Sequence, residues 1–468
     1  MEYKKNQLLT VKIDDIGRNG EGIGRYEDYI LFVKDAVCGD VVRAKITKVK
    51  KNYAFARCEE ILEASPERVE PPCSLYRRCG GCQIMALSYD AQLRFKENKV
   101  KNDLVRIGGV SSSVIDGVFE GITGMDNPER YRNKAQYPVG RDRSNDPVAG
   151  FYAGRTHSII PCDDCRISPE ENAAILRIIL KHMRDYDIEP YDETDGRGVV
   201  RHVLVRKGFS TGEIMVCLVI RHIGEPADEY LPGQERLVDG LLKIPGVRSI
   251  CVSINNDVTN VIMGNEIHTI SGSDRISDVL LTKRFEISPL SFYQVNPVQT
   301  EKLYSTVIEY AALSGTEEVW DICCGIGTIS ICLADKAGFV HGLEIVPEAI
   351  EDAMKNADLN NVENTEFICA PAQEYLPAHR DEITADVVIL DPPRKGMDEE
   401  SLEAITGIQP GKIVYVSCDS ATLARDIRYL SDHGYELKRV RCIDMFPHTV
   451  HCEVCCLLER RKELLLQD

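Results

Sequence analysis

The chain has 468 residues, of which 43% are apolar and 28% charged, and its formal net charge is −18. This length predicts two or three domains with ample apolar content for buried cores. No apolar run reaches the roughly 18 residues of a membrane span, and residues 1–6 lead into a strand-like pattern without the apolar segment of a secretory signal. We therefore expect a cytoplasmic protein with no membrane partner.

The charge is unevenly distributed along the chain. Residues 1–112 contain 20 Lys and Arg against 16 Asp and Glu, a net charge of +4, which leaves −22 for residues 113–468. The charge of the whole chain argues against a general nucleic-acid binder, which usually carries a basic footprint. A modestly basic N-terminal segment is compatible with one localised RNA-binding face, but charge alone does not decide this point.

Residues 1–62 are predicted to form a small all-β unit. Short strands with Lys and Arg between them are typical of a five-stranded oligonucleotide-binding barrel. A structural barrel with an ordinary solvated surface would have the same pattern. The strand candidates are Leu8–Ile13, Tyr29–Val33, Val41–Ile46 and Tyr53–Cys58, and the glycine-rich loop between the first two contains Gly17, Gly20, Gly22 and Gly24.

The middle segment, 66–280, is predicted to mix strands and helices. Pro66, Pro71 and Pro72 mark the linker before it, because proline stops both helix and strand continuation. Val199–Arg206 and Glu213–Ile220 read as two strands separated by a glycine turn, and Asn172–Arg184 reads as an amphipathic helix.

Cysteines are concentrated near the start of this middle segment. Cys73, Cys79 and Cys82 lie within ten residues around a Gly-Gly turn, and three thiolates at this spacing can surround one metal centre. A fourth ligand must come from elsewhere, and Cys162 and Cys165 are both candidates. All-thiolate ligation fits either zinc or an iron–sulfur cluster, and we expect a structural role.

Most other cysteines are scattered singly through strand-like apolar stretches. Cys217, Cys251, Cys332 and Cys369 are examples. In a long cytoplasmic protein such residues are expected to be reduced core thiols rather than disulfides.

From residue 281 onward, helical and strand-like segments alternate. This βαβ pattern predicts a Rossmann-like parallel sheet. The strand candidates are Glu318–Ile322, Val340–Glu344, Thr365–Ala370, Asp386–Leu390, Lys412–Ser417 and Cys452–Leu458.

A ligand pocket is predicted where the first of these strands ends. Gly325 and Gly327 follow Asp321 in a turn that lets the backbone approach a ligand closely. No third glycine stands at the dinucleotide spacing. Glu344 ends the next strand, where a carboxylate can accept hydrogen bonds from both ribose hydroxyls. Asp391 opens an Asp-Pro-Pro turn at the end of a later strand. These features favour a class I S-adenosylmethionine pocket over a dinucleotide site.

Cys418 and Glu453 form a candidate reactive pair. Cys418 leaves a buried strand at the ligand-binding edge, and Glu453 begins the final strand. Uracil C5 is a poor nucleophile until a thiolate adds to C6, which makes C5 a carbanion equivalent. A base must then remove the C5 proton so that the thiolate can leave. A cysteine beside a carboxylate is suited to this chemistry.

Four motifs resemble the signatures of RNA (uracil-5-)-methyltransferases. They are Phe292-x-Gln294-Val295-Asn296, Asp391-Pro392-Pro393-Arg394-Lys395-Gly396, Tyr415-Val416-Ser417-Cys418-Asp419-x-x-Thr422-Leu423-Ala424-Arg425-Asp426 and His448-Thr449-x-His451-x-Glu453. Residues 1–62 resemble a TRAM domain, so the likeness covers nearly the whole chain, although Cys323 stands where some members have an aromatic residue. The resemblance implies a nucleophile (Cys418), a base (Glu453), an S-adenosylmethionine site (Gln294, Cys323, Glu344 and Asp391) and a 4Fe–4S cluster (Cys73, Cys79, Cys82 and Cys165).

The implied fold is multidomain α/β + β. An OB-like TRAM barrel (1–62) is followed by a central α/β iron–sulfur domain (66–280) and a Rossmann-like class I methyltransferase domain (281–468). We expect a monomer that methylates C5 of a uridine in 23S ribosomal RNA, because the simpler transfer-RNA members of the family generally lack both the cluster cysteines and the TRAM-like segment.

Three other functions remain as alternatives. One is transfer-RNA uracil methylation, within the same family. Another is amino methylation of adenine or glutamine by an enzyme of the Asp-Pro-Pro type, which prefers an aromatic residue where Arg394 stands. The last is a catalytically silent RNA-binding or iron–sulfur sensor protein, which would have no need for Cys418 and Glu453 together.

Overall fold

The structure is a computed structural model that describes residues 3–154, 156–224 and 229–461. The described chain forms two compact units, each assembled from separated stretches of sequence. The first unit contains the residues up to Asn98, Phe151–Ile160 and Phe446–His451, and the second contains Lys99–Gly150, Pro161–Met445 and the residues from Cys452 onward. No helix of the described residues is both long enough and apolar enough to cross a membrane.

A closed barrel of five strands occupies the N-terminal part of the first unit, within the described residues. The strands follow the order β1-β2-β3-β5-β4 around the barrel. Alternate side chains point inward, so that Val11 and Leu31 are at most 2% exposed. Gly24 lets β2 approach β1, because a Cβ at this position would lie 2.2 Å from the carbonyl oxygen of Lys12. The bounds are β1 (Leu8–Ile16), β2 (Gly22–Tyr26), β3 (Tyr29–Lys34), β4 (Val41–Val49) and β5 (Tyr53–Glu63).

The prediction of an N-terminal five-stranded, OB-like barrel is confirmed by this architecture. One strand was missing from the candidates, since β2 begins inside the stretch interpreted as a glycine-rich loop. Glycine has no side chain to show the inside–outside alternation of a strand, and the pattern is therefore hidden there.

A mixed sheet of seven strands lies in the middle of the described sequence, in the order β13-β12-β11-β10-β7-β8-β9. Its two central strands, β10 and β11, form the predicted antiparallel pair, and α3 covers the predicted amphipathic helix. The bounds are β7 (Lys134–Arg141), β8 (Pro147–Tyr152), β9 (Ile159–Pro161), α3 (Glu171–Asp185), β10 (Val200–Lys207), β11 (Ile214–Ile220), α4 (Gln234–Leu241), β12 (Val247–Ile254) and β13 (Glu266–Gly272).

An eight-stranded sheet, counted over the described residues, forms the core of the C-terminal part, in the order β18-β17-β16-β19-β20-β22-β21-β6. The first five strands of this order are parallel, whereas β22 is antiparallel to both β20 and β21. The bounds are β6 (Phe119–Thr123), β16 (Glu318–Ile322), β17 (Phe339–Glu344), β18 (Thr365–Cys369), β19 (Val387–Leu390), β20 (Lys412–Ser417), β21 (Tyr435–Ile443) and β22 (Glu453–Arg460).

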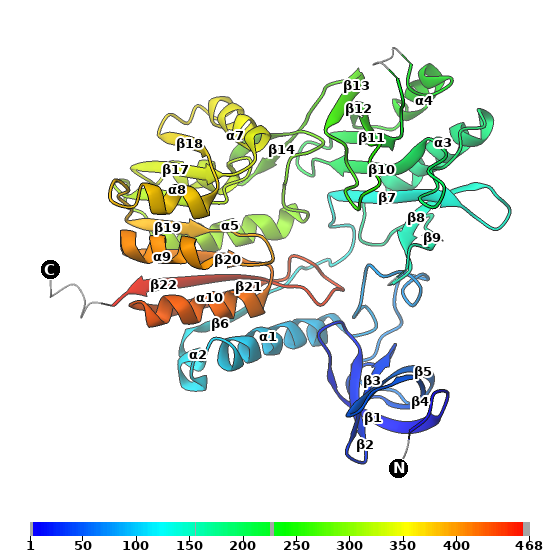
Figure 1. Ribbon diagram of the computed structural model, residues 1–468, viewed down its shortest axis with the longest axis horizontal. Coiled ribbons are helices and arrows are strands. Elements are labelled where there is room, and N and C mark those ends of the chain that lie inside the picture. The colour runs from blue at the N-terminus through cyan, green and yellow to red at the C-terminus, as the bar shows by residue number, and fades with distance from the viewer. Residues whose placement is uncertain (1–2, 155, 225–228, 462–468) are drawn as a thin grey trace. The chain divides into compact units, whose positions relative to one another are not determined.

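Helices pack on both faces of this sheet. Figure 1 shows α8, α9 and α10 side by side across one face and α5 on the other. A small hairpin, β14–β15, precedes α5. The remaining bounds are α1 (Tyr89–Arg106), α2 (Ser112–Val118), β14 (Ile276–Leu280), β15 (Lys283–Ile287), α5 (Pro297–Ala311), α6 (Thr328–Ala334), α7 (Pro347–Leu359), α8 (Ala372–Ala378), α9 (Glu399–Ile408) and α10 (Ser420–Asp432).

The predicted Rossmann-like sheet is confirmed in its main part, and all six strand candidates are present. The sheet is parallel in its first five strands rather than throughout, because β22 and its antiparallel partner β21 extend it, with β6 at its edge. β6 comes from residues far upstream, which a pattern read along the chain does not connect with this sheet. The division into the segments 1–62, 66–280 and 281–468 stays a prediction, although hairpin β14–β15 spans its boundary at residue 280.

Candidate active site

One edge of the C-terminal sheet collects the candidate residues. The parallel strands β16, β17, β19 and β20 run in the same direction, so their carboxyl ends lie at one edge of the sheet. The residues at or just after these ends are Cys323, Glu344, Asp391 and Cys418. Because β22 is antiparallel to β20, its first residue, Glu453, lies at the same edge. Ligands bind along this edge in open α/β sheets. The fold thus gathers residues that are up to 130 positions apart in sequence.

The ladder between β20 and β22 places Cys418 beside Glu453. Ser417 pairs with Val454, so Cys418 and Glu453 are the next cross-strand neighbours. Cys418 is partly buried and Glu453 is 3% exposed. Burial and then the carboxylate of Glu453 raise the pKa of the Cys418 thiol to about 11, while Arg394 opposes this shift. The thiol is therefore protonated in the unbound protein at neutral pH, and it must lose that proton before it can attack.

Three carboxyl groups at this edge have raised pKa values. Burial raises the pKa of Glu453 to about 8, with Asp391 adding to the shift and Arg394 opposing it. Burial also raises the pKa of Asp391 to about 7, and Asp321 adds to this shift. The pKa of Asp321 itself is raised to about 6 by burial, although the hydroxyl of Ser330 donates a hydrogen bond to it. Groups that titrate near neutral pH are suited to proton transfer.

The turn after β16 contributes backbone groups to the site. Gly325 and Gly327 have φ values of 57° and 76°, and Gly327 is the N-cap of α6. Glycine is favoured there because these are left-handed conformations. The backbone N–H of Gly325 donates to Glu344 Oε2 (3.1 Å), and the other carboxylate oxygen accepts from the N–H groups of the two residues after Glu344 (2.8 and 3.0 Å). The carboxylate of Glu344 is thus held in place at the end of its strand.

Gln294 and Cys323 complete the set of predicted cofactor contacts. Gln294 is 7% exposed, and its side-chain amide has no hydrogen-bond partner among the described residues, while its carbonyl oxygen accepts from Asn133 (2.9 Å). A polar group without a hydrogen-bond partner favours a ligand that satisfies it, and the buried Oδ1 of Asp321 also has no partner among the described residues. Burial raises the pKa of Cys323 to about 12, so this residue remains a thiol. Both residues fit a pocket that a polar ligand completes.

Helix α10 holds the loop that carries Asp391 and Arg394. The guanidinium of Arg425 donates to the carbonyl oxygens of Lys395 (3.1 Å) and Met397 (2.9 Å). Asp426 is completely buried and accepts hydrogen bonds from the backbone N–H of Met397 (3.0 Å) and from the hydroxyl of Tyr415 (2.6 Å). The motif at residues 415–426, which contains the predicted nucleophile, therefore also positions the Asp-Pro-Pro-Arg loop.

Arg394 was not among the predicted site residues, although its motif was. It is exposed, yet its charge influences the pKa of both Cys418 and Glu453. The sequence signal was the Arg after the two prolines. Its contribution to the site depends on the pairing of β20 with β22, which motif spacing does not show.

The cysteine-rich segment of the first unit contains Cys73, Cys79 and Cys82. The backbone N–H of Gly81 donates to Cys79 Sγ (3.4 Å). The backbone of Cys79 forms an isolated antiparallel β-bridge with that of Ala153. A Cβ on Gly80 would lie 3.1 Å from the Cα of Gly154. The Gly-Gly turn is thus needed for close packing, and it also directs an N–H group at a thiol.

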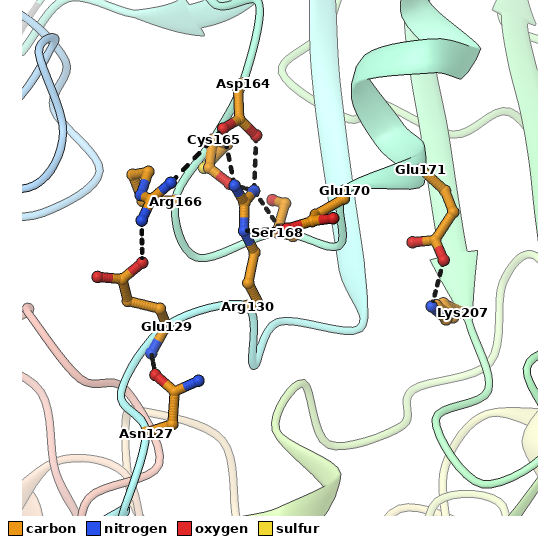
Figure 2. A network of polar contacts seen from close by, with 10 residues as sticks. All are labelled: Asn127, Glu129, Arg130, Asp164, Cys165, Arg166, Ser168, Glu170, Glu171 and Lys207. Carbon is orange, nitrogen blue, oxygen red and sulfur yellow. Dashed lines mark hydrogen bonds and ion pairs between the residues drawn. The ribbon is translucent and has the colours of Figure 1, made fainter.

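The second cysteine segment belongs to the other unit, and Figure 2 shows the polar contacts that fix it. Arg130 donates to both carboxylate oxygens of Asp164 (2.6 and 2.7 Å) and to the carbonyl oxygens of Cys165 and Ser168. A hydrogen bond from Cys162 lowers the pKa of the Cys165 thiol below its usual range, although burial opposes this effect. Cys162 itself is 6% exposed.

The predicted metal centre is not demonstrated by the geometry. Within residues 3–154, 156–224 and 229–461, no group of three or more His, Cys, Asp or Glu side chains is placed to hold a metal ion. The assignment of Cys73, Cys79, Cys82 and Cys165 as ligands therefore remains a prediction.

Three of the four scattered cysteines named above are buried reduced thiols, as predicted. They are Cys217, Cys251 and Cys332. Cys369 is an exception, because it is exposed at the end of the outermost strand, β18, rather than buried in the core.

Comparison with known protein families and sequences gives consistent results. The family model for tRNA (uracil-5-)-methyltransferase matches residues 275–461, and the TRAM domain model matches residues 3–58. An uncharacterized RNA methyltransferase of Halalkalibacterium halodurans is 46% identical over 457 residues, which is 97% of each chain. Another from Listeria innocua is 46% identical over 456 residues, 97% of this chain and 98% of the relative.

Comparison with solved structures extends this likeness to three dimensions. The tRNA (uracil-54, C5)-methyltransferase of Pyrococcus abyssi, solved in complex with S-adenosyl-L-homocysteine, superposes with a TM-score of 0.75 at 26% identity. The superposition covers 96% of this chain and all of the archaeal one. These matches show that the chain is an RNA methyltransferase with a TRAM domain, a member of the RNA (uracil-5-)-methyltransferase family.

Proposed function

We propose that this protein methylates C5 of a specific uridine in 23S ribosomal RNA through a covalent bond between Cys418 and C6 of the base. The observation that carries this proposal is the pairing of β20 with β22, which makes Cys418 and Glu453 neighbours at the ligand-binding edge. A nucleophile and a base side by side are what C5 methylation requires. An amino methyltransferase would not need the cysteine.

The chemistry assigns one task to each residue of the pair. The thiol of Cys418 gives up its proton to solvent, and the thiolate sulfur forms a bond to C6 while the C5–C6 π electrons move toward C5 and O4. Carbon C5 then takes the methyl group. Glu453 removes the remaining C5 proton, and the electrons of that C–H bond restore the double bond as the C6–S bond breaks. The raised pKa of Glu453, about 8, makes its carboxylate a stronger base than an ordinary one, and a bound cationic ligand would favour that charged form.

S-adenosylmethionine, the donor indicated by the family and by the product-bound archaeal neighbour, would supply the methyl group when bound. Glu344 would hold the ribose hydroxyls, and Gln294, Cys323 and Asp391 would line the remainder of the site. The unpartnered amide of Gln294 fits a polar ligand, and the acidic groups Asp321 and Asp391 fit a cationic one.

Transfer RNA is the second candidate substrate. The archaeal neighbour is named for a transfer-RNA nucleotide and matches nearly the whole of this chain. The TRAM barrel therefore does not by itself separate ribosomal from transfer RNA, and the preference for ribosomal RNA rests on the cysteine pattern and the family resemblance.

Cys73, Cys79, Cys82 and Cys165 are proposed to hold a 4Fe–4S cluster that orders the structure around it. Two local features support this assignment. Gly81 directs an N–H group at Cys79 Sγ, and Arg130 fixes the segment that carries Cys165 (Figure 2). N–H groups directed at sulfur are common around thiolate ligands. Cys162 is the alternative fourth ligand, and zinc is the alternative metal.

The substrate is identified by mapping 5-methyluridine in ribosomal and transfer RNA from a strain that lacks the gene. Loss of one or two sites in 23S ribosomal RNA, restored by the wild-type gene but not by a Cys418→Ala gene, is expected. Loss confined to transfer RNA would show that the second candidate is right.

A further inference from the structure

Three cationic side chains gather on one face of the central sheet. In the ladder between β7 and β10, Lys134 lies directly opposite Arg206, and directly opposed residues of antiparallel strands share a face. Arg132 is close by, since its Nε donates to the carbonyl oxygen of Lys134 (3.0 Å). Like charges placed opposite each other repel, so this arrangement is unfavourable by itself.

The neighbouring cations are neutralised by carboxylates, but these three are not. Among the described residues, no ion pair involves Arg132, Lys134 or Arg206. By contrast, each of three cations nearby in the fold has a carboxylate oxygen at 2.6 Å. Figure 2 shows these three pairs, which are Arg130 with Asp164, Arg166 with Glu129 and Lys207 with Glu171.

Burial makes these unneutralised positive charges more unfavourable. Arg206 is 4% exposed, and its Nε is buried without a hydrogen-bond partner among the described residues. Lys134 is partly buried, and burial, followed by the charges of Arg206 and Arg132, lowers its pKa to about 7. A buried positive charge that has only carbonyl oxygens as partners, and no carboxylate, is unfavourable. The cluster is therefore a place that an anion would stabilise.

The cluster is attached to the loop that carries the predicted cofactor contact Gln294. Arg206 donates to the carbonyl oxygen of Ser291 in this loop. Asn133, which lies between Arg132 and Lys134 in sequence, donates through its side chain to the carbonyl oxygen of Gln294 (2.9 Å) and through its backbone to that of Val295 (2.8 Å). An anion at the cluster would thus lie beside the loop that precedes α5.

We propose that Lys134, with Arg132 and Arg206, binds a backbone phosphate of the RNA substrate near the target nucleotide. The proposal rests on the proposed function only in taking RNA as the ligand. Phosphate contacts from Lys and Arg position a nucleic acid without reading its sequence. The carboxylate of S-adenosylmethionine is the other oxyanion that could occupy this position, and the experiment separates the two.

The test measures RNA binding by wild type and Lys134→Gln from 50 to 300 mM KCl, together with calorimetric binding of S-adenosyl-L-homocysteine. One lost phosphate contact should reduce the slope of log affinity against log salt by about 0.7 to 0.9 and weaken RNA binding several-fold at low salt. Affinity for S-adenosyl-L-homocysteine should stay within twofold of wild type. Lys134→Arg should restore both RNA affinity and slope.

The matched control is Lys207→Gln, one residue along β10 from Arg206, because the amine of Lys207 already has a partner in Glu171. It should leave the salt slope unchanged. The melting temperature of unbound Lys134→Gln should equal or exceed that of wild type, since the substitution removes an unpaired charge. An unchanged salt slope in Lys134→Gln would overturn the proposal, as would a loss of S-adenosyl-L-homocysteine affinity. If the wild type binds RNA but methylates neither ribosomal nor transfer RNA, the proposed function fails while this test still applies.

Discussion

At the scale of single residues, the central feature is a thiol and a carboxyl group that both carry a proton more readily than usual. Burial raises the pKa of Cys418 to about 11 and that of Glu453 to about 8. The unbound site is thus held close to electrical neutrality. Binding of a cationic ligand would favour the charged carboxylate, so the site becomes reactive as it fills.

Glu453→Gln should separate the two halves of the reaction. The amide keeps the size of the side chain but cannot accept the C5 proton. Addition of Cys418 and methyl transfer should still occur, so a methylated protein–RNA adduct should accumulate while turnover falls by at least about 10²-fold. Denaturing gels with labelled S-adenosylmethionine would show the label on the adduct. Turnover at the wild-type rate without an adduct would mean that another group, with Asp391 the next candidate, is the base.

Glu453 should also make the unbound protein less stable at alkaline pH. Its folded-state pKa is raised from 4.5 to about 8, so its stabilising contribution is complete below about pH 4.5 and is lost as the pH rises through 8. Glu453→Gln removes this loss. The melting temperature of the variant relative to wild type should therefore be higher at pH 8.5 than at pH 5.5, by several degrees. The exposed control Glu400→Gln should show no such difference, and an equal effect of Glu453→Gln at both pH values would contradict the assignment.

At the scale of secondary-structure elements, α10 connects the proposed nucleophile Cys418 with the Asp-Pro-Pro-Arg loop. Arg425→Gln should release the carbonyl oxygens of Lys395 and Met397, and so loosen the loop that carries Asp391. We expect methylation to fall by about 10- to 100-fold, because small displacements of catalytic groups reduce rates strongly. The melting temperature should change by only a few degrees, since Arg425 is exposed.

Arg428→Gln is the control for this helix, because Arg428 is exposed on the same element three residues further on. It should methylate RNA at the wild-type rate. If Arg425→Gln is as active as the control, the hydrogen bonds to the loop do not position the site.

The elements also show how far sequence patterns determine this fold. Glu318–Ile322 and Lys412–Ser417 were predicted to the residue, because short apolar runs between helices are distinctive. β21 and β6 were missed, since Tyr435–Ile443 carries charged residues at several positions and Phe119–Thr123 lies far upstream. The pairing of these strands depends on contacts distant in sequence.

The candidate site could be predicted further than the fold around it. Motif positions predicted Cys418 and Glu453, which are the next cross-strand neighbours after the Ser417–Val454 pair of β20 and β22. The sequence did not predict that the charge of Arg394 would lower the pKa values of this pair, nor that three cations would gather around Lys134. Both depend on which strands lie next to each other, and that is a property of the folded chain.

At the scale of the whole molecule, the cysteine-rich segments belong to two different compact units. Purified without oxygen, the protein should be brown and should contain about four iron and four sulfide per chain. Substitution of Cys73, Cys79, Cys82 or Cys165 by serine should each remove the colour, while Cys162→Ser should keep it. A colourless protein with one zinc per chain would show that the iron–sulfur assignment is wrong. Loss of colour in Cys162→Ser, with colour retained in Cys165→Ser, would show that Cys162 is the fourth ligand.

The most direct test of the account as a whole is a trapping experiment with RNA that carries 5-fluorouridine at the target position. Fluorine at C5 does not leave as a proton does, so the wild type should form a stable adduct whose peptide map places the bond on Cys418. Cys418→Ala should form no adduct and no 5-methyluridine, yet bind S-adenosyl-L-homocysteine within a few-fold of wild type. An adduct through another cysteine, or substantial turnover by Cys418→Ala, would contradict the account.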